Sequence, residues 1–292
     1  MMKQIIDDTL LFAVVILLVL CLSDPVFSGI IRTKIVCRHT VDRTGKVGIE
    51  VEVKNAGDAT AYNVVVSIFL ADWAQVYDNL GDNKPGGQIR VRSRFYNPDL
   101  NPGRYTLAIR VSFEEQSGRA HRAYHFSRIS YRLDRKGAYK PALSFRLEPP
   151  VFNTKAFFGH KGKLKLFLEN SHARRISPSI FLCLPDGFRA YEPNRYYQLG
   201  PGEERTDMIP ITMDRSVRKG GVYHAVLWYE VNGLHYSELI KGRIGVEERP
   251  VYFTWYLVLS TVCLVLLSVV VYYLNRREKR ISPQAQRGDR DV

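Results

Sequence analysis

The sequence predicts an all-β protein with two tandem immunoglobulin-like β-sandwiches, one C-terminal transmembrane α-helix and an N-terminal signal or anchor helix. Three observations lead to this prediction. Short runs of β-branched and aromatic residues, bounded by Gly, Asn, Asp and Pro, fill residues 31–247 with almost no helical periodicity. The order of these runs occurs twice, which indicates that one module has been duplicated. Residues 251–274 then carry no charged side chain over 24 positions, enough helix to cross a hydrocarbon core about 30 Å thick.

The first sandwich is predicted within residues 32–133. Its clearest strand is residues 47–53, in which Val or Ile at odd positions alternates with Gly or Glu at even positions. Such a period of two is typical of a strand with one buried and one solvated face. With the runs at residues 33–40, 62–70, 89–96, 104–113 and 120–131 it makes six clear candidates, so we expect about seven strands, the inventory of an immunoglobulin-like sandwich.

The second sandwich is predicted within residues 142–247, after a charged linker at residues 134–141 that contains Gly and Pro. The two halves share two sequence features. In each half a Gly-Lys pair lies at the start of an alternating strand, and a later strand begins with a glycine that is followed within two residues by a tyrosine. Its strand candidates are residues 143–147, 163–169, 179–184, 204–212, 222–231 and 235–244.

Short motifs in both halves resemble known β-sandwich families. Residues 53–66, VKNAGDATAYNVVV, are similar to the cell-adhesion-related CARDB family, in which a strand, an N-x-G turn, an Ala and alternating valines follow in that order. The second half is similar to the NEW3 domain associated with alpha-galactosidases. It departs from that pattern where Ser171 and His172 follow Asn170, because a turn Gly is expected there. The resemblance covers residues 32–247 and implies a prokaryotic surface or secreted protein without implying a reaction. The matching segments of the second half are residues 168–170, 184–188 and 199–203.

The two ends of the chain predict membrane targeting and orientation. Residues 1–28 have the short apolar run and small-residue exit of a secretory signal peptide, with an uncleaved signal anchor as the alternative. Residues 275–292 form a tail with six basic and three acidic residues, so the positive-inside rule places the C-terminus in the cytoplasm and the sandwiches outside. The residues predicted to anchor the span are Trp255, Tyr256, Tyr272, Tyr273, Arg276 and Arg277.

The net charge of +13 comes mainly from the predicted exterior domains, since residues 29–250 hold 35 basic and 23 acidic side chains. A positive exterior surface attracts anionic lipid headgroups, acidic glycans and other acidic polymers. A solubilising surplus of basic side chains without a polyanionic partner also explains this charge.

The predicted binding face lies on the strand candidate at residues 120–131 and just after it. Guanidinium groups and rings occur there at even positions, so one strand face combines side chains that bind acidic groups bidentately and stack on flat surfaces. An acidic glycan, a lipid headgroup or an acidic protein is the expected ligand, and nucleic acid is not expected for an exterior domain. The alternative is that the rings point into the sandwich and the arginines line its outer face. The residues are Arg122, Tyr124, Phe126, Arg128 and Arg132.

The pattern of cysteines and histidines predicts no disulfide framework, metal site or cofactor. Cys37 and Cys183 fall in different halves and are expected to be buried free thiols. His121 and His125 lie about 13 Å apart on a predicted strand, too far to hold one ion. The oxygen-rich residues 78–83 leave calcium binding as an alternative to a solvated loop. Because the sequence motifs of serine hydrolases, zinc proteases and phosphate-binding loops are missing, we expect the protein not to be an enzyme.

These observations predict a single-pass type I membrane protein of a prokaryote, with extracytoplasmic immunoglobulin-like domains for adhesion, scaffolding or partner binding. Its expected partners are membrane lipids and proteins of the cell envelope. One alternative is an accessory subunit of an envelope complex that synthesises, exports or modifies polymers, in which the span makes the essential contacts. Another is an acidic-glycan-binding module.

Overall fold

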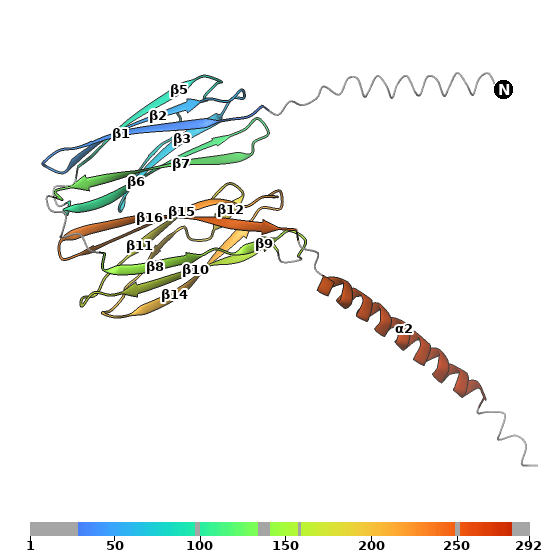
Figure 1. The fold of residues 1–292 in the computed structure, drawn as a ribbon. Coiled ribbons are helices and arrows are strands. Elements are labelled where there is room, and N and C mark those ends of the chain that lie inside the picture. Colours follow the sequence, from blue (N-terminus) through green and yellow to red (C-terminus); the bar gives the residue numbers. More distant parts are fainter. Residues whose placement is uncertain (1–28, 97–99, 134–140, 157–158, 249–251, 282–292) are drawn as a thin grey trace, which may run out of the picture.

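The computed structural model describes residues 29–96, 100–133, 141–156, 159–248 and 252–281. Within these residues the protein is mostly β, with one helix, α2 (Tyr252–Ile281), after the last strand (Figure 1). The predicted signal segment, nearly all of the predicted linker and the end of the predicted tail lie outside the described residues. Below, the first half means residues 29–133 and the second half means residues 141–248.

Two antiparallel sheets enclose an apolar core in the first half. The inward side chains of one central strand, which alternate with glutamates, show only 0% to 2% exposure, so the period-two pattern found the buried face correctly. One sheet has the order β1 (Thr33–Val41), β2 (Lys46–Asn55), β5 (Gln88–Tyr96). The other has the order β7 (Ala120–Tyr131), β6 (Gly103–Glu114), β3 (Tyr62–Leu70), β4 (Trp73–Tyr77).

The second half encloses a core of its own between two further sheets. One sheet has the order β12 (Phe188–Ala190), β14 (Glu204–Met213), β10 (Lys161–Asn170), β8 (Leu143–Glu148). The facing strands run in the order β13 (Asn194–Tyr196), β11 (Ser179–Cys183), β15 (Gly221–Val231), β16 (Leu234–Glu247), and β9 (Val151–Asn153) pairs with β16 in parallel. The predicted β-sandwich fold is therefore confirmed, while its assignment to the immunoglobulin-like type stays a prediction.

The sequence did not predict four short strands, which are β4, β9, β12 and β13. β4 follows β3 through a two-residue turn in which Ala71 has a φ of 49°. Such turns favour Gly or Asn, so Ala71-Asp72 gives no hairpin signal. β9 comes after Pro149 and Pro150, which end β8 and let the chain cross to the other sheet. β12 and β13 have three residues each, too few for a periodic pattern.

A buried asparagine holds together a turn of the first half. Asn55 is 1% exposed, and its Nδ2 donates to the carbonyl oxygens of Ala59 and Asn83 at 2.7 and 2.9 Å. Its Oδ1 accepts a hydrogen bond from the amide of Gly57 at 3.0 Å. The asparagine thereby replaces backbone partners that the turn cannot supply.

Asn170 repeats this arrangement in the second half. It is 0% exposed, and its Nδ2 donates to the carbonyls of Arg174, Leu199 and Gly200 at 2.9, 3.2 and 2.7 Å. Its Oδ1 accepts from the amide of His172 at 2.9 Å. The matching bonds are the structural counterpart of the sequence order that repeats between the halves.

α2 is long and apolar enough to cross a membrane. Its segment Tyr256–Leu274 has a mean hydropathy of 2.5 over 19 residues, and none of it is buried against the rest of the chain. The helix continues past residue 274, where the span was predicted to end, so the beginning of the predicted tail is helical. Tyr256, Tyr272, Tyr273 and Arg276 are exposed; the side chains of Trp255 and Arg277 lie outside the described part of the chain.

Candidate functional site

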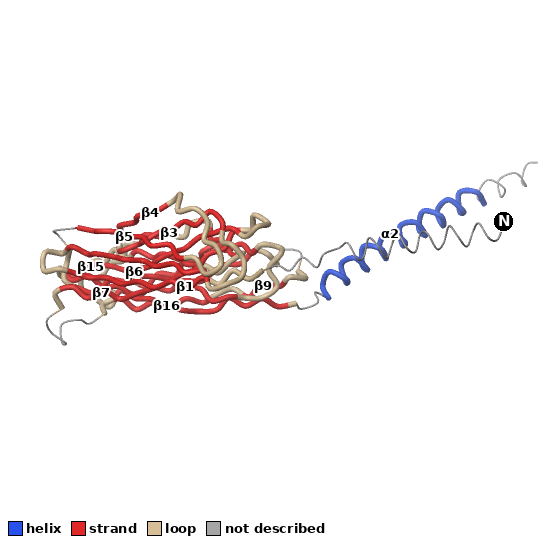
Figure 2. The backbone as a smooth tube through the Cα atoms, turned by 90° about the horizontal axis from the view of Figure 1, so that it is seen from above, coloured by secondary structure: helices blue, strands red, loops and turns tan. Residues whose placement is uncertain are grey.

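The two halves pack face to face, so that their strands form four successive layers (Figure 1). One parallel pair, His235 of β16 with Gly103 of β6, joins the two inner layers into one nine-stranded sheet. Side chains of both halves build a third buried cluster between the inner layers: Ala108 from the first half, with Phe181, Cys183 and Val226 from the second. The ring of Phe69 lies 4.8 Å from the ring of Phe181 across this boundary. Figure 2 shows that the strands of both halves run in roughly one direction, with α2 leaving from one end.

The strands at this interface are apolar on both faces, which is the sequence signal for it. β11 is buried at all five positions of SIFLC, and β6 is buried from Tyr105 through Ile109. A strand covered on both faces appears as a continuous apolar run, whereas a strand with one wet face alternates. Sequence reasoning used these runs only to locate strands, although they also indicated a second covered face.

Polar contacts link the halves at one end of the interface through Asp186. One of its carboxylate oxygens lies 2.9 Å from His121 Nδ1, and the other accepts from the amide of Arg122 at 2.8 Å. The second ring nitrogen of His121 lies 3.1 Å from Glu115, whose pKa is lowered by hydrogen bonds from Ser117 and then from His121. A histidine of the first half is thus held between two carboxylates, one of them from the second half.

A second polar contact is buried in the middle of the interface. The hydroxyl of Ser237 accepts from the amide of Thr106 at 3.1 Å and lies 2.8 Å from the Thr106 hydroxyl. Both residues are at most 9% exposed. Because buried polar groups are costly without partners, this pair favours one register of the two halves over others.

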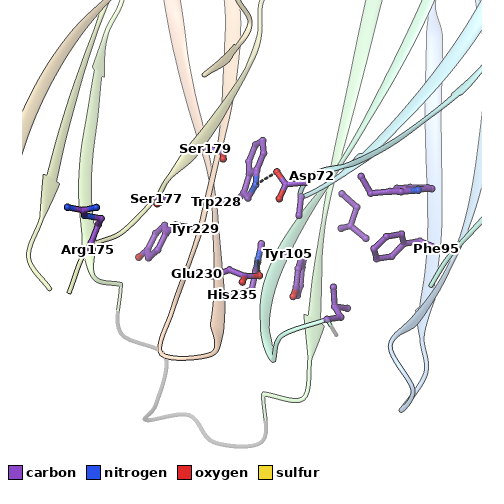
Figure 3. Close-up of a pocket in the computed structure, with 14 residues that line it drawn as sticks. Asp72, Phe95, Tyr105, Arg175, Ser177, Ser179, Trp228, Tyr229, Glu230 and His235 are labelled. Carbon is purple, nitrogen blue, oxygen red and sulfur yellow. Dashed lines mark hydrogen bonds and ion pairs between the residues drawn. The ribbon is translucent and has the colours of Figure 1, made fainter. Parts of the chain in front are cut away.

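A cleft of about 580 Å³ opens between the halves near the point where β16 meets β6 (Figure 3). Aromatic side chains of both halves form its walls, and three charged, exposed residues line it: Asp72, Arg175 and Glu230. The aromatic residues are Trp73, Phe95, Tyr105, Trp228 and Tyr229.

Two carboxylates of the cleft are already oriented by neighbours. Asp72 accepts from the indole nitrogen of Trp228 at 3.2 Å, and Glu230 accepts from Asn101 at 2.7 Å, both bonds joining the two halves. Glu230 also lies 3.3 Å from Nδ1 of His235. The hydrogen bond from His235 lowers the pKa of Glu230, with a smaller contribution from Asn101, so the carboxylate form is favoured.

His235 forms the floor of the cleft, at the point where the two halves meet. It is 2% exposed and stacks on Tyr105 of the first half, with ring centroids 3.8 Å apart. The backbones also meet there, because the amide of His235 donates to the carbonyl of Pro102 at 2.9 Å. Gly103 has to be a glycine, since a Cβ at this position would overlap the backbone of His235.

Four of the five residues of the predicted binding face lie on β7, and the structure shows what they meet. Tyr124 and Phe126 are half-buried against the second half, and Phe126 lies 4.7 Å from the ring of His224. Burial raises the pKa of Tyr124 to about 12. The rings therefore point neither into the sandwich core nor into solvent, and they already have an intramolecular partner. Their role in ligand binding stays a prediction.

The three arginines of that predicted face have separate surroundings. Arg122 is exposed beside Asp186. Arg128 lies near Glu238, whose pKa is raised by burial, an effect that the arginine partly offsets. Arg132 is beyond the end of β7 and donates to the carbonyl of Arg43 at 2.7 Å. The structure does not bring these guanidinium groups together in one cluster.

Both predicted free thiols are free, but only one is fully buried. Cys183 is 0% exposed between the halves, and burial raises its pKa to about 12. Cys37 is half-buried, and burial raises its pKa to about 11. Thiols with pKa values this high are weak nucleophiles at neutral pH.

The oxygen-rich residues 78–83 make contacts within the chain. Asp82 accepts from the amide of Asn63 at 3.1 Å, and the buried Asn83 donates to the carbonyl of Val53 at 3.2 Å. Among the residues that the structure describes, no group of three or more His, Cys, Asp or Glu side chains could hold a metal ion.

The polar and aromatic side chains of the cleft have distinct contacts. Ser177 and Ser179 line the cleft, but within the described ranges neither hydroxyl is hydrogen-bonded to His235, as activation of a serine nucleophile requires. Aromatic walls accept flat apolar surfaces, and the two carboxylates accept hydrogen bonds from hydroxyl or ammonium groups. The fold and site define a β-sandwich protein with a C-terminal apolar helix and an aromatic cleft between its halves.

No family model and no curated protein matches the chain, so the CARDB and NEW3 resemblance stays a prediction. Among solved structures, alpha-2-macroglobulin of E. coli is 11% identical over 74% of this chain, with a TM-score of 0.30. Red sea bream transglutaminase is 9% identical over 75% of this chain and 32% of its own, with a TM-score of 0.26. A protein of unknown function from Porphyromonas gingivalis W83 is 13% identical over 74% of this chain and 99% of its own, with a TM-score of 0.32. The chain spans only 17% of the macroglobulin, and likenesses this distant carry no argument about function.

Proposed function

We propose that the protein is a non-catalytic, membrane-anchored binding protein, with α2 as its anchor and two immunoglobulin-like sandwiches held as one unit outside the cytoplasm. The observation that carries this proposal is the interface between the halves, because its buried cluster and buried hydrogen bonds fix the walls of the aromatic cleft. Fixed walls lower the entropic cost of binding a partner. The partner is a protein segment of the cell envelope that inserts into this cleft.

The immunoglobulin-like assignment is supported by the first half. Its strand order, with three strands facing four, is compatible with that class. Tyr105, near the start of β6, donates from its hydroxyl to the carbonyl of Asn101 at 2.7 Å. A tyrosine bonded to the backbone a few residues upstream is the tyrosine corner that many such sandwiches use.

Site-specific photo-crosslinking tests the cleft. A photo-reactive residue replaces the exposed Ser177 at the cleft, and the matched control replaces the exposed Ser144 on the outer face of β8. In living cells we expect one discrete adduct from position 177 and none from position 144. Equal adducts from both positions, or none from either, would contradict the cleft as the partner site.

Membrane orientation is tested with a membrane-impermeant maleimide on intact cells. In the proposed type I orientation, Thr44→Cys in the first half is labelled and Ser282→Cys after the span is not. Removal of residues 249–292 should release the protein from the membrane fraction if the signal segment is cleaved. Labelling of position 282 in intact cells would refute this orientation.

The second candidate function is an accessory subunit of an envelope complex, in which α2 makes specific contacts. The observation that favours it is a row of polar side chains on one side of the helix, Thr261, Ser268 and Tyr272, since hydroxyl groups support helix packing in membranes. Replacement of residues 251–274 by an unrelated span separates the two functions. If the protein binds its partner through the cleft, the variant with the unrelated span still forms the photo-crosslinked adduct from position 177. If the protein is a subunit held by its span, the variant no longer supports the function of the envelope complex.

A further inference from the structure

The outer face of the first sheet, formed by β1, β2 and β5, is strongly basic. At the positions that point away from the core it carries seven basic and only two acidic side chains, and all nine are exposed or half-exposed. The acidic residues, Glu50 and Glu52, lie on the middle strand. The basic residues are Lys34, Lys46, Lys54, Arg38, Arg90, Arg92 and Arg94.

The register of the strands shows how these charges are distributed. Arg92 pairs with Glu50 at 3.2 Å and Arg90 with Glu52 at 3.4 Å, so the two acids are matched across neighbouring strands. The remaining basic residues form no ion pair with any described residue. Arg94 lies opposite Gly48, and Arg38 lies opposite Glu50 from the other side. The face therefore keeps a surplus of five positive charges after its acids have been neutralised.

Nothing in the described chain covers this face. The other sheet of the first half packs on the second half, whereas β1, β2 and β5 contribute to the first core on one side and to the surface on the other. The corresponding outer face of the second half is less basic. It carries Arg146, Lys161, Lys163, Lys165 and Arg189 against Glu148, Glu169 and Glu204.

The chemistry of the face favours an extended acidic polymer over a folded protein or a bilayer. Arg90, Arg92 and Arg94 follow one another at alternate positions of β5, about 7 Å apart along a nearly straight line. Guanidinium groups bind carboxylate, sulfate and phosphate groups through paired hydrogen bonds. Protein interfaces and membrane-inserting surfaces need apolar anchors at their centre. Here the only large apolar side chains exposed on the face are Val36 and Tyr96, at the two outer strands.

We propose that this basic sheet face, which combines a row of three exposed arginines on β5 with a surplus of five basic over acidic side chains, binds a linear acidic polysaccharide. Although Arg90 and Arg92 contact glutamates, their side chains are 62% and 80% exposed, so their guanidinium groups are open to a ligand. The polymer lies along β5, with successive acidic groups against Arg90, Arg92 and Arg94. This site is separate from the cleft between the halves and does not depend on what the cleft binds. Arg122, Arg128 and Arg132, which suggested glycan binding from the sequence, are not part of it.

The test compares two triple variants of the full chain in detergent micelles. Arg90→Gln/Arg92→Gln/Arg94→Gln removes three charges from alternate positions of β5. Lys161→Gln/Lys163→Gln/Lys165→Gln removes three charges from alternate positions of β10, on the other outer face. All six side chains point away from the cores, so both variants should keep the thermal unfolding midpoint of the wild type. The probe is polygalacturonate, a linear polymer of carboxylated sugars, and dextran is the neutral control.

We expect the arginine variant to lose at least about tenfold in affinity for polygalacturonate, because each exposed contact between opposite charges contributes about fivefold. The lysine variant should stay within about twofold. Binding by the wild type should weaken as salt increases, and the arginine variant should show a smaller salt dependence. Equal losses in the two variants would overturn the proposal, since net charge alone would then explain binding.

Two further probes separate the acidic glycan from other anions. Vesicles with one third phosphatidylglycerol and duplex DNA are titrated under the same conditions. If either binds more tightly than polygalacturonate and loses more affinity in the arginine variant, the face serves a bilayer or a nucleic acid and the proposal is overturned. Tight binding of dextran would overturn it as well, because dextran carries no charge.

Discussion

The turns around Asn55 and Asn170 have equivalent hydrogen bonds, yet they differ at the residue two positions later. In the first half that residue is Gly57, where a Cβ would overlap the carbonyl of Ile30. In the second half it is His172. Neither residue has a positive φ, so a neighbouring chain segment and not the turn conformation requires the glycine. The asparagine therefore determines the turn, whereas Gly57 leaves room for the neighbouring backbone of Ile30.

The largest expected effect comes from removing the asparagines. Among the described residues, Asn170→Ala leaves only the Arg174 carbonyl without a donor, because the carbonyls of Leu199 and Gly200 also accept from backbone amides. Asn55→Ala likewise leaves only the Ala59 carbonyl without a donor, because the carbonyl of Asn83 also accepts from the amide of Ala61. Each substitution also removes the acceptor of one backbone amide, that of His172 or of Gly57. At about 1 kcal/mol or more for each buried group, we expect the free energy of unfolding to fall by about 2 to 3 kcal/mol for each variant in urea titrations. Asn194→Ala, at an exposed position, is the control. Losses no larger than the control would show that the asparagines do not hold the turns.

A smaller effect is expected from the residue that distinguishes the turns. Gly57→Ala forces the backbone of Ile30 to move and should cost about 1 to 3 kcal/mol. His172→Ala keeps the amide that bonds to Asn170 and should cost less than about 1 kcal/mol. Both values are measured by urea unfolding of the same protein. If the two substitutions lower the free energy of unfolding equally, the close contact between position 57 and the backbone of Ile30 is not the reason for the glycine.

Much of the fold was predictable from the sequence because local patterns determine it. The alternation in β2 and β10, the turn residues and the uncharged segment of α2 each act within a few residues. The cleft was not predictable, because its residues come from distant parts of the chain. Trp228 and Asp72, which hydrogen-bond across it, are 156 residues apart in sequence. Tyr124 and Phe126 are an example. The strand pattern correctly placed them on one face of β7, but it could not show that the second half covers that face.

The coupling of the halves gives the next prediction. Asp186→Ala removes the acceptor for His121 and for the amide of Arg122, at a cost of about 1 to 2 kcal/mol. Asp214→Ala is the control, because Asp214 pairs with Arg189 only at 3.8 Å and with both side chains exposed. Calorimetry should show the two halves of the wild type unfolding in one transition, and Asp186→Ala should separate their midpoints. A single unshifted transition in Asp186→Ala would mean that this contact does not couple the halves.

The smallest effect concerns pH. The pKa of Glu230 in the folded protein is lowered below its ordinary value of 4.5 by His235 and Asn101. Its carboxylate therefore stabilises the folded state above pH 4.5, and this contribution is lost as the pH falls through the lowered pKa. Glu230→Gln should make stability less dependent on pH below 4.5, by a few tenths of a kcal/mol because the side chain is half exposed. An unchanged slope of unfolding free energy against pH would contradict this role.

The position of β16 between the interface and α2 has a mechanical consequence. β16 ends at Glu247 and α2 begins at Tyr252, so in the proposed function, with α2 in the membrane and a partner in the cleft, tension would enter the β-structure at the end of β16. That strand pairs with β15 along eleven residue pairs and with β9 in parallel. Tension along its axis therefore loads many hydrogen bonds at once in shear, and does not open them one after another. The strand that carries this load is thus the same strand that supplies His235 to the floor of the cleft.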